Sequence, residues 1–201
     1  AAGQVDDRIL SLIDVTATTL SIADVEPPPL MQGRPFLGAD APFERRFAFA
    51  ARDRIDETAQ RIRSVHDERY HYIRTISTGP TFASLNRYKE KCFPIIPLMR
   101  AMHDRGELSG PPLELMERIG PCEELYDTDA DRDEVHNLLE SPDPEHREAL
   151  SRLRAALHTW MVETGARGAE PEPDSDVTPF AAEMDQWFGT PAWFRAAPSV
   201  K

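Results

Sequence analysis

The fold is decided by the stretch RIRSVHDERYHYIR, residues 61–74. Apolar or aromatic residues alternate with polar ones from Arg61 to Asp67 and again from Tyr70 to Ile76, as in strands with one buried and one solvated face. The charged residues 67–69 between them suit a tight turn. The stretch therefore predicts a β-hairpin.

Weaker signals on either side of the hairpin predict more elements. Phe47–Ala51 and Glu123–Tyr126 have the composition of short strands. The intervening stretch through Pro80 and Pro94 is predicted to be irregular, apart from a helix from Pro97 to Arg105 that Gly106 closes. These segments favour a mixed structure with an antiparallel sheet.

The clearest helix follows the sequence Ser-Pro-Asp-Pro at residues 141–144. Asp143 can cap it and Pro144 suits its first turn, while Gly165 supplies the stop. Its apolar residues recur at helical spacing along one stripe: Leu150, Leu153, Leu157 and Trp160, continued by Met161 and Thr164. An amphipathic helix is predicted here, followed by a solvated tail linker over residues 168–176 and an aromatic cluster of Trp187, Phe188, Trp193 and Phe194.

A second helix is predicted near the start, from Asp6 to Asp24. It is apolar on a broad face, which comprises Ile9, Leu10, Leu12, Ile13, Val15, Leu20 and Ile22. Prolines 27–29 end it, and the extended stretch to Arg45 resembles a domain junction. Since a helix this apolar normally packs on a sheet, we expect its partner to lie outside the 201 residues.

Composition restricts the kinds of partner. The formal net charge of -12 and a pI near 4.9 argue against nucleic acid and anionic membranes. No apolar run reaches the roughly 18 residues that a membrane-spanning helix needs. Cys92 and Cys122 match neither zinc nor redox spacing, which favours two unpaired thiols over one disulfide.

An acidic segment invites a calcium-loop interpretation. Asp129, Asp131, Asp133 and Glu140 fall at positions 1, 3, 5 and 12 of an EF-hand pattern. However, Glu134 occupies position 6, where the turn requires glycine. A solvated acidic turn is therefore favoured. The six histidines form no zinc-protease pair, and each is expected to be structural.

A series of segments in order resembles the C-terminal third of the type I, formylglycine-dependent sulfatases, nearest the heparan N-sulfatase branch. The resemblance covers roughly residues 8–170. The matching segments are Ser11–Leu20, Gln32–Phe36, Arg61–Val65 with Arg69–Arg74, Glu124–Asp127, Asp131 and Glu134 with Asn137–Leu138, Leu153–Trp160, and Glu163–Gly165.

The resemblance implies an α+β fold: a small four-stranded antiparallel sheet packed on a long C-terminal helix, preceded by the last helix of a truncated alkaline-phosphatase-like α/β domain. Residues 1–44 would end that large domain, residues 45–170 would form the sulfatase C-terminal subdomain, and residues 171–201 would be a tail. The sheet that covers the first helix would then lie upstream.

The resemblance also implies that the parent enzyme hydrolyses sulfate esters or sulfamates of sulfated sugars, such as glycosaminoglycans. It would use Ca2+ and a formylglycine made from a Cys/Ser-x-Pro-Ser-Arg motif, and would be periplasmic or secreted. Cys92-Phe93-Pro94 continues with Ile95 and Ile96 and is a chance match. The sulfatase catalytic and metal residues precede the matched region, so this chain alone is expected to have no catalytic residue, no metal ligand, no cofactor and no activity.

One segment of this chain is expected to touch substrate, because the corresponding loop of related sulfatases lies near the active-site mouth. The expected substrate-binding residues are Arg52, Asp53, Arg54, Asp56 and Glu57. Arginine suits sulfate or uronate through paired donors, and carboxylates suit sugar hydroxyls or an amino group. A solvated charged turn is the alternative.

The expected partners are the rest of the sulfatase chain and, in the parent enzyme, a sulfated carbohydrate. A dimer of this chain through residues 6–24 is a further expectation. Two other functions stay open: a stand-alone acidic interaction module with an α+β fold, and a part of a related phosphodiesterase or phosphonate hydrolase.

Overall fold

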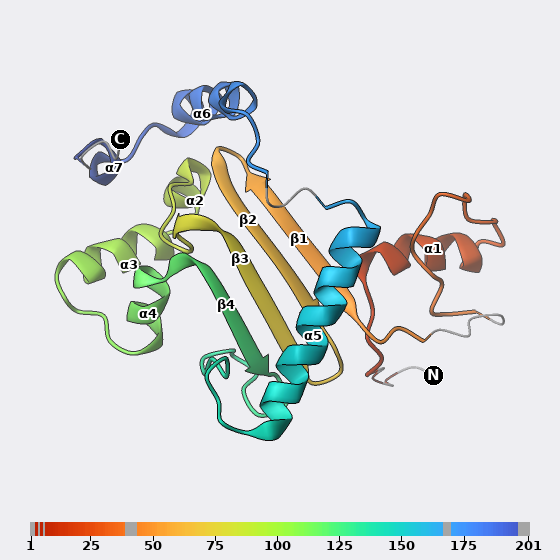
Figure 1. Cartoon of the computed structure of the whole chain (residues 1–201). Coiled ribbons are helices and arrows are strands. Elements are labelled where there is room, and N and C mark those ends of the chain that lie inside the picture. The colour runs from red at the N-terminus through yellow and green to blue at the C-terminus, as the bar shows by residue number, and fades with distance from the viewer. Residues whose placement is uncertain (1–2, 4, 6, 39–43, 167–169, 197–201) are drawn as a thin grey trace. The chain divides into compact units, whose positions relative to one another are not determined.

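The structure is a computed structural model that describes residues 3, 5, 7–38, 44–166 and 170–196 (Figure 1). Helices and strands alternate irregularly along the chain, as in an α+β fold. In order they are α1 (Leu12–Ile22), β1 (Ala48–Ile55), β2 (Thr58–His66), β3 (Tyr70–Pro80), α2 (Arg87–Cys92), α3 (Ile95–Asp104), α4 (Pro111–Glu117), β4 (Ile119–Asp127), α5 (Pro144–Glu163), α6 (Asp174–Phe188) and α7 (Ala192–Ala196).

The strands form one four-stranded sheet in the order β1-β2-β3-β4. The amide of Thr128, just after β4, donates to the carbonyl of Arg69, just before β3. The amide of Thr81, just after β3, donates to the carbonyl of Arg118, just before β4. The last two strands are therefore antiparallel. The predicted hairpin and the α+β fold class with a four-stranded antiparallel sheet are confirmed.

The chain divides into two compact units. Unit 1 comprises Ala1–Ala50, Ser64–Tyr72 and Leu125–Glu163, and unit 2 comprises Ala51–Arg63, Ile73–Glu124 and Thr164–Lys201. The domain boundaries predicted at residues 44 and 170 stay a prediction.

The core of unit 1 lies between the sheet and α5. Buried strand residues Val65, Tyr70, Tyr72 and Leu125 pack against the helix residues Ala149, Leu150, Leu153 and Leu157. The ring of Trp160 also stacks on Phe49, with centroids 5.1 Å apart. The predicted stripe of α5 is thus the face that the sheet covers, and the predicted bounds of this helix are confirmed within one residue.

The first helix is shorter than predicted. It begins at Leu12 rather than Asp6, a residue that lies outside the described ones. The cause is local: the carboxylate of Asp14 accepts a hydrogen bond from the amide of Ser11 at 2.9 Å, which caps the helix there. At the other end, Asp24 adopts a positive φ of 55° and the helix ends at Ile22.

Helix α1 buries its polar side. Asp14 and Thr18 are buried, and both accept hydrogen bonds from backbone amides of the following extended stretch, Arg34 and Phe36 respectively. A Cβ at Gly33 would lie 2.0 Å from the carbonyl oxygen of Ile13, so only glycine permits this approach. That α1 is the last helix of an alkaline-phosphatase-like domain stays a prediction.

Unit 2 contains more helix than predicted. Helix α3 confirms the predicted helix within two residues, but α2 forms where irregular chain was expected, and α4 forms where no helix was predicted. The amide of Lys89 donates to the side chain of Asn86, which caps α2, and Gly110 with a φ of 59° precedes the proline that begins α4. Each of these two helices is marked in the sequence by a single capping residue or glycine. The prolines near α2 favoured the prediction of irregular chain instead.

Further differences concern the ends of elements and the tail. Strand β4 begins at Ile119, four residues before the predicted start, and α6 begins at Asp174, inside the predicted linker. Residues 168 and 169 of that linker lie outside the described ones.

Both cysteines are free, and burial raises the pKa of the Cys122 thiol. In the described part of the chain, no helix has the length and apolar character needed to cross a bilayer.

Candidate functional site

The predicted substrate-binding residues lie at the end of a hairpin of unit 2. Arg52, Asp53 and Arg54 belong to β1, while Asp56 and Glu57 form the turn before β2. The prediction that all of Arg52–Glu57 forms a loop is therefore wrong. Strand β1 runs on to Ile55 because it pairs with β2, and the chain turns at Asp56, which has a positive φ of 51°.

The two arginines are engaged within the unit. The guanidinium of Arg52 donates to the amide oxygen of Gln60, which is buried. Burial lowers the pKa of Arg52. Arg54 pairs with Glu172 at 2.5 Å and lies over the ring of Phe180 at 4.3 Å. Both guanidinium groups therefore already have a partner within the unit.

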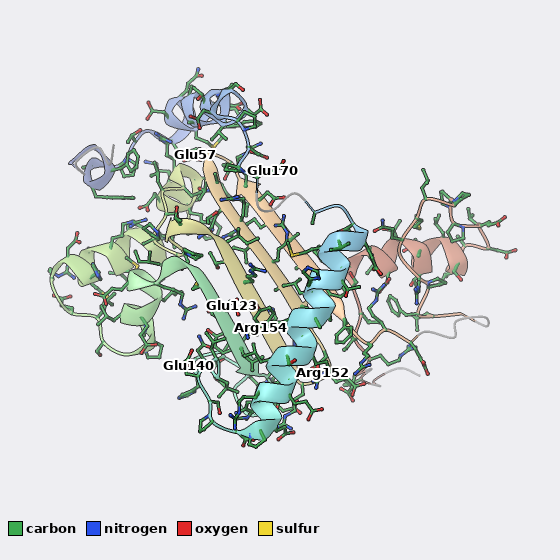
Figure 2. All side chains as sticks on the ribbon, in the orientation of Figure 1. Glu57, Glu123, Glu140, Arg152, Arg154 and Glu170 are labelled. Atoms are coloured by element: carbon green, nitrogen blue, oxygen red, sulfur yellow. The ribbon has the colours of Figure 1, made fainter. Side chains whose placement is uncertain are left out.

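The three carboxylates also have partners. Asp53 accepts from Arg63 at 2.6 Å, and Asp56 accepts from the amide group of Asn86 at 3.0 Å. Glu57 accepts from the backbone amide of Arg87 at 2.8 Å and from its guanidinium at 3.2 Å. The Glu57 side chain is only 4% exposed and lies at the tip of the hairpin beside α2 (Figure 2). Its role in this structure is to join the hairpin to α2.

Asp53 differs from the other four because its side chain remains 51% exposed. It lines a pocket of about 640 Å³ in unit 2. The other lining residues are Ala59, Arg61, Ser77, Thr78, Glu170, Pro171, Glu172, Pro173, Asp174 and Val177. Hydroxyls and carboxylates predominate among the polar groups of this pocket, so it suits a ligand that donates hydrogen bonds, such as a polyol or an amine.

Arg63, which positions Asp53, was not among the predicted site residues. Arg63 is buried, with 2% of its side chain exposed. Besides Asp53, its guanidinium donates to the carbonyl oxygens of Arg52 and Ile62, both at 2.9 Å. Its position in a strand, two residues before the fully buried Val65, was the available signal, since residues i and i+2 share a face.

The acidic segment after β4 forms a hydrogen-bonded turn. The Asp127 carboxylate accepts from Arg69 at 2.7 Å and from the amides of Asp129 and Ala130, and the pKa of Asp127 is lowered, mainly by Arg69. The Asp131 carboxylate accepts from the amides of Val135 and His136. Among the described residues, no group of three or more His, Cys, Asp or Glu side chains is arranged to hold a metal ion.

Comparison with known proteins identifies the family. No protein-family model matches the chain. It is 32% identical over 169 residues to a protein named as an ulvan-active sulfatase from Formosa agariphila, an alignment that covers 84% of this chain. The chain is a homologue of the C-terminal part of a sulfatase. It spans 28% of the length of this relative.

Among solved structures, this sulfatase homologue is similar to a putative sulfatase from Bacteroides thetaiotaomicron, with a TM-score of 0.49, 16% identity, and coverage of 80% of this chain and 27% of that chain. It is also similar to a protein described as a 2-O GAG sulfatase, with a TM-score of 0.48, 16% identity and the same coverage. A place in the heparan N-sulfatase branch stays a prediction.

Proposed function

We propose that this chain is the C-terminal subdomain of an enzyme that hydrolyses sulfate esters or sulfamates of sulfated sugars. It completes the fold of that enzyme and forms part of the substrate cleft. The relative that acts on ulvan supports a carbohydrate substrate. The proposal includes a longer polypeptide, periplasmic or secreted, whose other part carries the reaction.

The observation that carries this proposal is the inverted burial of α1. Leu12 is 89% exposed and Ile22 is 67% exposed, while Asp14 on the same helix is fully buried. Ile13 and Val15 are about half exposed. Burying an apolar side chain of this size contributes about 1.5 to 3 kcal/mol. The exposed apolar side chains of α1 form a surface that would pack against a sheet or against helices in the larger part of the enzyme.

The residues of this chain do not fit the calcium and formylglycine of sulfatases. Cys92 is followed by Phe93 and Pro94, but Ile95 and Ile96 stand where the motif needs Ser and Arg. The described residues also supply no metal-ligand group. Nucleophile and metal are therefore assigned to the rest of the polypeptide, and no catalytic step is assigned to this chain.

Within the proposed cleft, Asp53 is the best-placed group to contact substrate. Its carboxylate is held by Arg63 and half exposed at a pocket, so it can accept a hydrogen bond from a sugar hydroxyl or amino group. Direct contacts by Arg52, Arg54, Asp56 and Glu57 stay a prediction. Their intramolecular bonds fit a second task, which is to fix the hairpin on which Asp53 lies.

Two forms of the protein test the proposal. The isolated chain should release no sulfate from a sulfated sugar, whereas the longer polypeptide should. Leu12→Glu and Ile22→Glu should lower the yield of active, folded enzyme, because they place charges in the proposed interface. The matched control is Val162→Glu on α5, where valine is 68% exposed. Full activity in both α1 variants would refute the docking of α1.

The isolated chain offers a further test. With the apolar side of α1 uncovered, it should self-associate through residues 6–24, and Leu12→Glu should restore a monomer in light scattering. A wild-type chain that stays monomeric with α1 folded would instead favour the stand-alone acidic module. Turnover of a sulfate ester by the isolated chain would refute the assignment of catalysis to the rest of the enzyme.

A further inference from the structure

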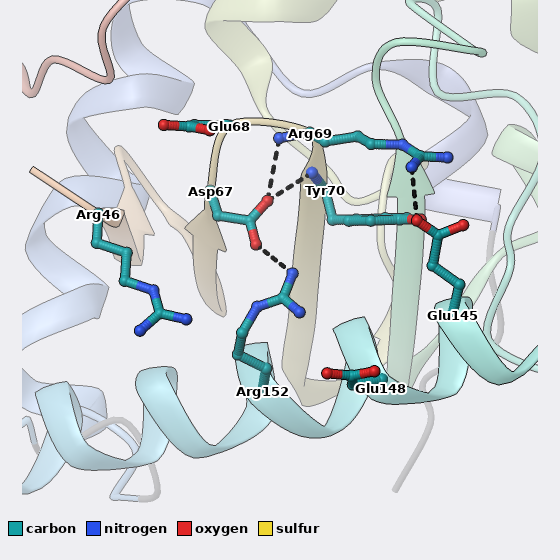
Figure 3. Close-up of a pocket in the computed structure, with 8 residues that line it drawn as sticks. All are labelled: Arg46, Asp67, Glu68, Arg69, Tyr70, Glu145, Glu148 and Arg152. Atoms are coloured by element: carbon teal, nitrogen blue, oxygen red, sulfur yellow. Dashed lines mark hydrogen bonds and ion pairs between the residues drawn. The ribbon is translucent and has the colours of Figure 1, made fainter.

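Unit 1 contains a second pocket that the proposed function does not use. It has a volume of about 450 Å³ and lies between α5, the β2–β3 turn and the residue Arg46 that precedes β1 (Figure 3). Seven of its eight lining residues are charged, namely Arg46, Asp67, Glu68, Arg69, Glu145, Glu148 and Arg152, and the eighth is Tyr70.

The floor of this pocket is fixed by Asp67. Its buried carboxylate accepts from the backbone amides of Arg69 at 3.0 Å and Tyr70 at 2.7 Å, and from Arg152 at 2.6 Å. Although burial opposes ionisation, these donors together lower the pKa of Asp67, so it stays ionised near neutral pH. Arg152 is thereby held through one terminal nitrogen, and the rest of its guanidinium remains available to a ligand.

Arg46 faces the same space from the opposite side. Figure 3 shows its guanidinium directed toward that of Arg152. Its contact is with the ring of the adjacent Phe47, at 5.3 Å. Arg46 makes no ion pair with any residue that the structure describes. Two guanidinium groups therefore line one pocket, one held by a carboxylate and one without an ion-pair partner among the described residues, and guanidinium groups are the donors that bind sulfate and carboxylate oxygens in pairs.

The carboxylates of the pocket divide into two kinds. Glu145 is paired with Arg69 at 2.7 Å. Glu68 and Glu148 are exposed and have no ion-pair partner among residues 44–166 and the other described segments. Free carboxylates would repel a simple anion, but they accept hydrogen bonds from hydroxyl groups. A ligand that carries an oxyanion together with hydroxyl groups satisfies both kinds of side chain.

Tyr70 provides an independent observation. Its residue is 3% exposed, and its hydroxyl has no hydrogen-bond partner within the described structure. A buried hydroxyl without a hydrogen-bond partner is unfavourable. Figure 3 shows the Tyr70 side chain extending away from Arg46 and Arg152, toward Glu145, so a hydroxyl of the ligand rather than its oxyanion, or an ordered water, would satisfy it.

We propose that this pocket is a binding site for an acidic saccharide. The sulfate or carboxylate group of the saccharide lies between Arg46 and Arg152, and its hydroxyls donate to Glu68 and Glu148. The choice of a saccharide rests on the proposed function. The site itself is defined by unit 1 alone, and its test involves no sulfatase turnover.

The test is titration of the isolated chain, labelled with 15N, with three probes: glucose 6-sulfate, glucuronate and glucose. We expect an acidic probe to give saturable shifts in the Arg46 side-chain N–H and in the amides of the β2–β3 turn. Arg46→Gln should weaken this binding roughly tenfold or more, as expected for loss of a charge-assisted pair. Arg46→Lys should weaken it less. Arg132→Gln, at another exposed arginine of unit 1 without a described partner, should leave it unchanged.

Each outcome decides the proposal. Saturable binding of either acidic probe that Arg46→Gln weakens by roughly tenfold or more and Arg132→Gln preserves supports it, and the comparison of the two probes identifies the oxyanion. Absence of saturable shifts with both acidic probes would overturn it, as would equal binding of glucose or full affinity in Arg46→Gln. Such a failure would leave the sulfatase assignment intact, because that rests on homology and on α1.

Discussion

The carboxylate of Asp14, fully buried on α1, accepts two hydrogen bonds from the guanidinium of Arg45, at 2.5 and 2.9 Å. The same carboxylate accepts hydrogen bonds from the backbone amides of Ser11 and Arg34. A single side chain therefore caps the helix, fixes the extended stretch that follows it and neutralises an arginine 31 residues away. This ion pair explains why α1 keeps its polar side inward.

Asp14→Ala should be strongly destabilising, by about 3 to 5 kcal/mol, because it leaves the guanidinium of Arg45 and two amides without their acceptor. Urea unfolding followed by circular dichroism measures the effect. Asp24→Asn is the matched control, since Asp24 is an exposed residue at the end of the same helix and asparagine tolerates its positive φ. Equal stability of the Asp14 variant and wild type would show that this network is not stabilising.

The apolar stripe of α5 that packs on the sheet leads to a second prediction, on the stability of two variants of this helix. Leu153 is fully buried against the sheet, and Leu153→Ala should cost about 2 to 5 kcal/mol through lost contacts and a cavity. Val162→Ala, on an exposed position of the same helix, should change stability by less than about 0.5 kcal/mol. Similar losses in both variants would contradict the assigned packing face.

Periodicity predicted the elements whose burial alternates. The turn of the β2–β3 hairpin follows from Val65, Tyr70 and Tyr72 on one face, although β2 begins three residues before the predicted Arg61 and β3 ends four residues after the predicted Ile76. The bounds of α5 follow from its leucine stripe and the prolines before it. Both are local signals that the sequence repeats several times. The short helices α2 and α4 depend instead on a single cap or glycine, which composition obscures.

Charge pairing could not be predicted in the same way. The run Arg52–Glu57 has the composition of a solvated turn, yet its partners Gln60, Arg63 and Glu172 come from β2 and from a segment more than a hundred residues later. The spacing of residues along the chain does not predict such long-range pairs. For the same reason, the Arg46–Arg152 pocket is visible only in the folded chain.

Arg63 offers a test of the hairpin that holds Asp53. Arg63→Ala should destabilise the protein by about 2 to 3 kcal/mol, because two carbonyl oxygens lose their donor and a buried side chain leaves a cavity. Arg74→Ala, at an exposed position of β3, should be nearly neutral. Unfolding by urea distinguishes them. An Arg63 variant as stable as wild type would mean that Asp53 is positioned by other groups.

Acid should destabilise the protein through its buried and hydrogen-bonded carboxylates. The pKa values of Asp14, Asp67 and Asp127 are all lowered in the folded state, despite burial in the first two and mainly through Arg69 in the third. Each group therefore contributes stability that is fully present above the unfolded-state pKa of about 3.9 and is lost as pH falls through the lower folded-state pKa.

Urea midpoints should accordingly be nearly level from pH 7 to about pH 5 as far as these groups are concerned, and should fall steeply below about pH 4. Asp127→Asn should lower the midpoint at pH 7 and also flatten the acid slope, because the variant has one such carboxylate fewer. If Asp127→Asn lowers stability equally at pH 7 and pH 3, the ion pair with Arg69 is not the source of the acid sensitivity.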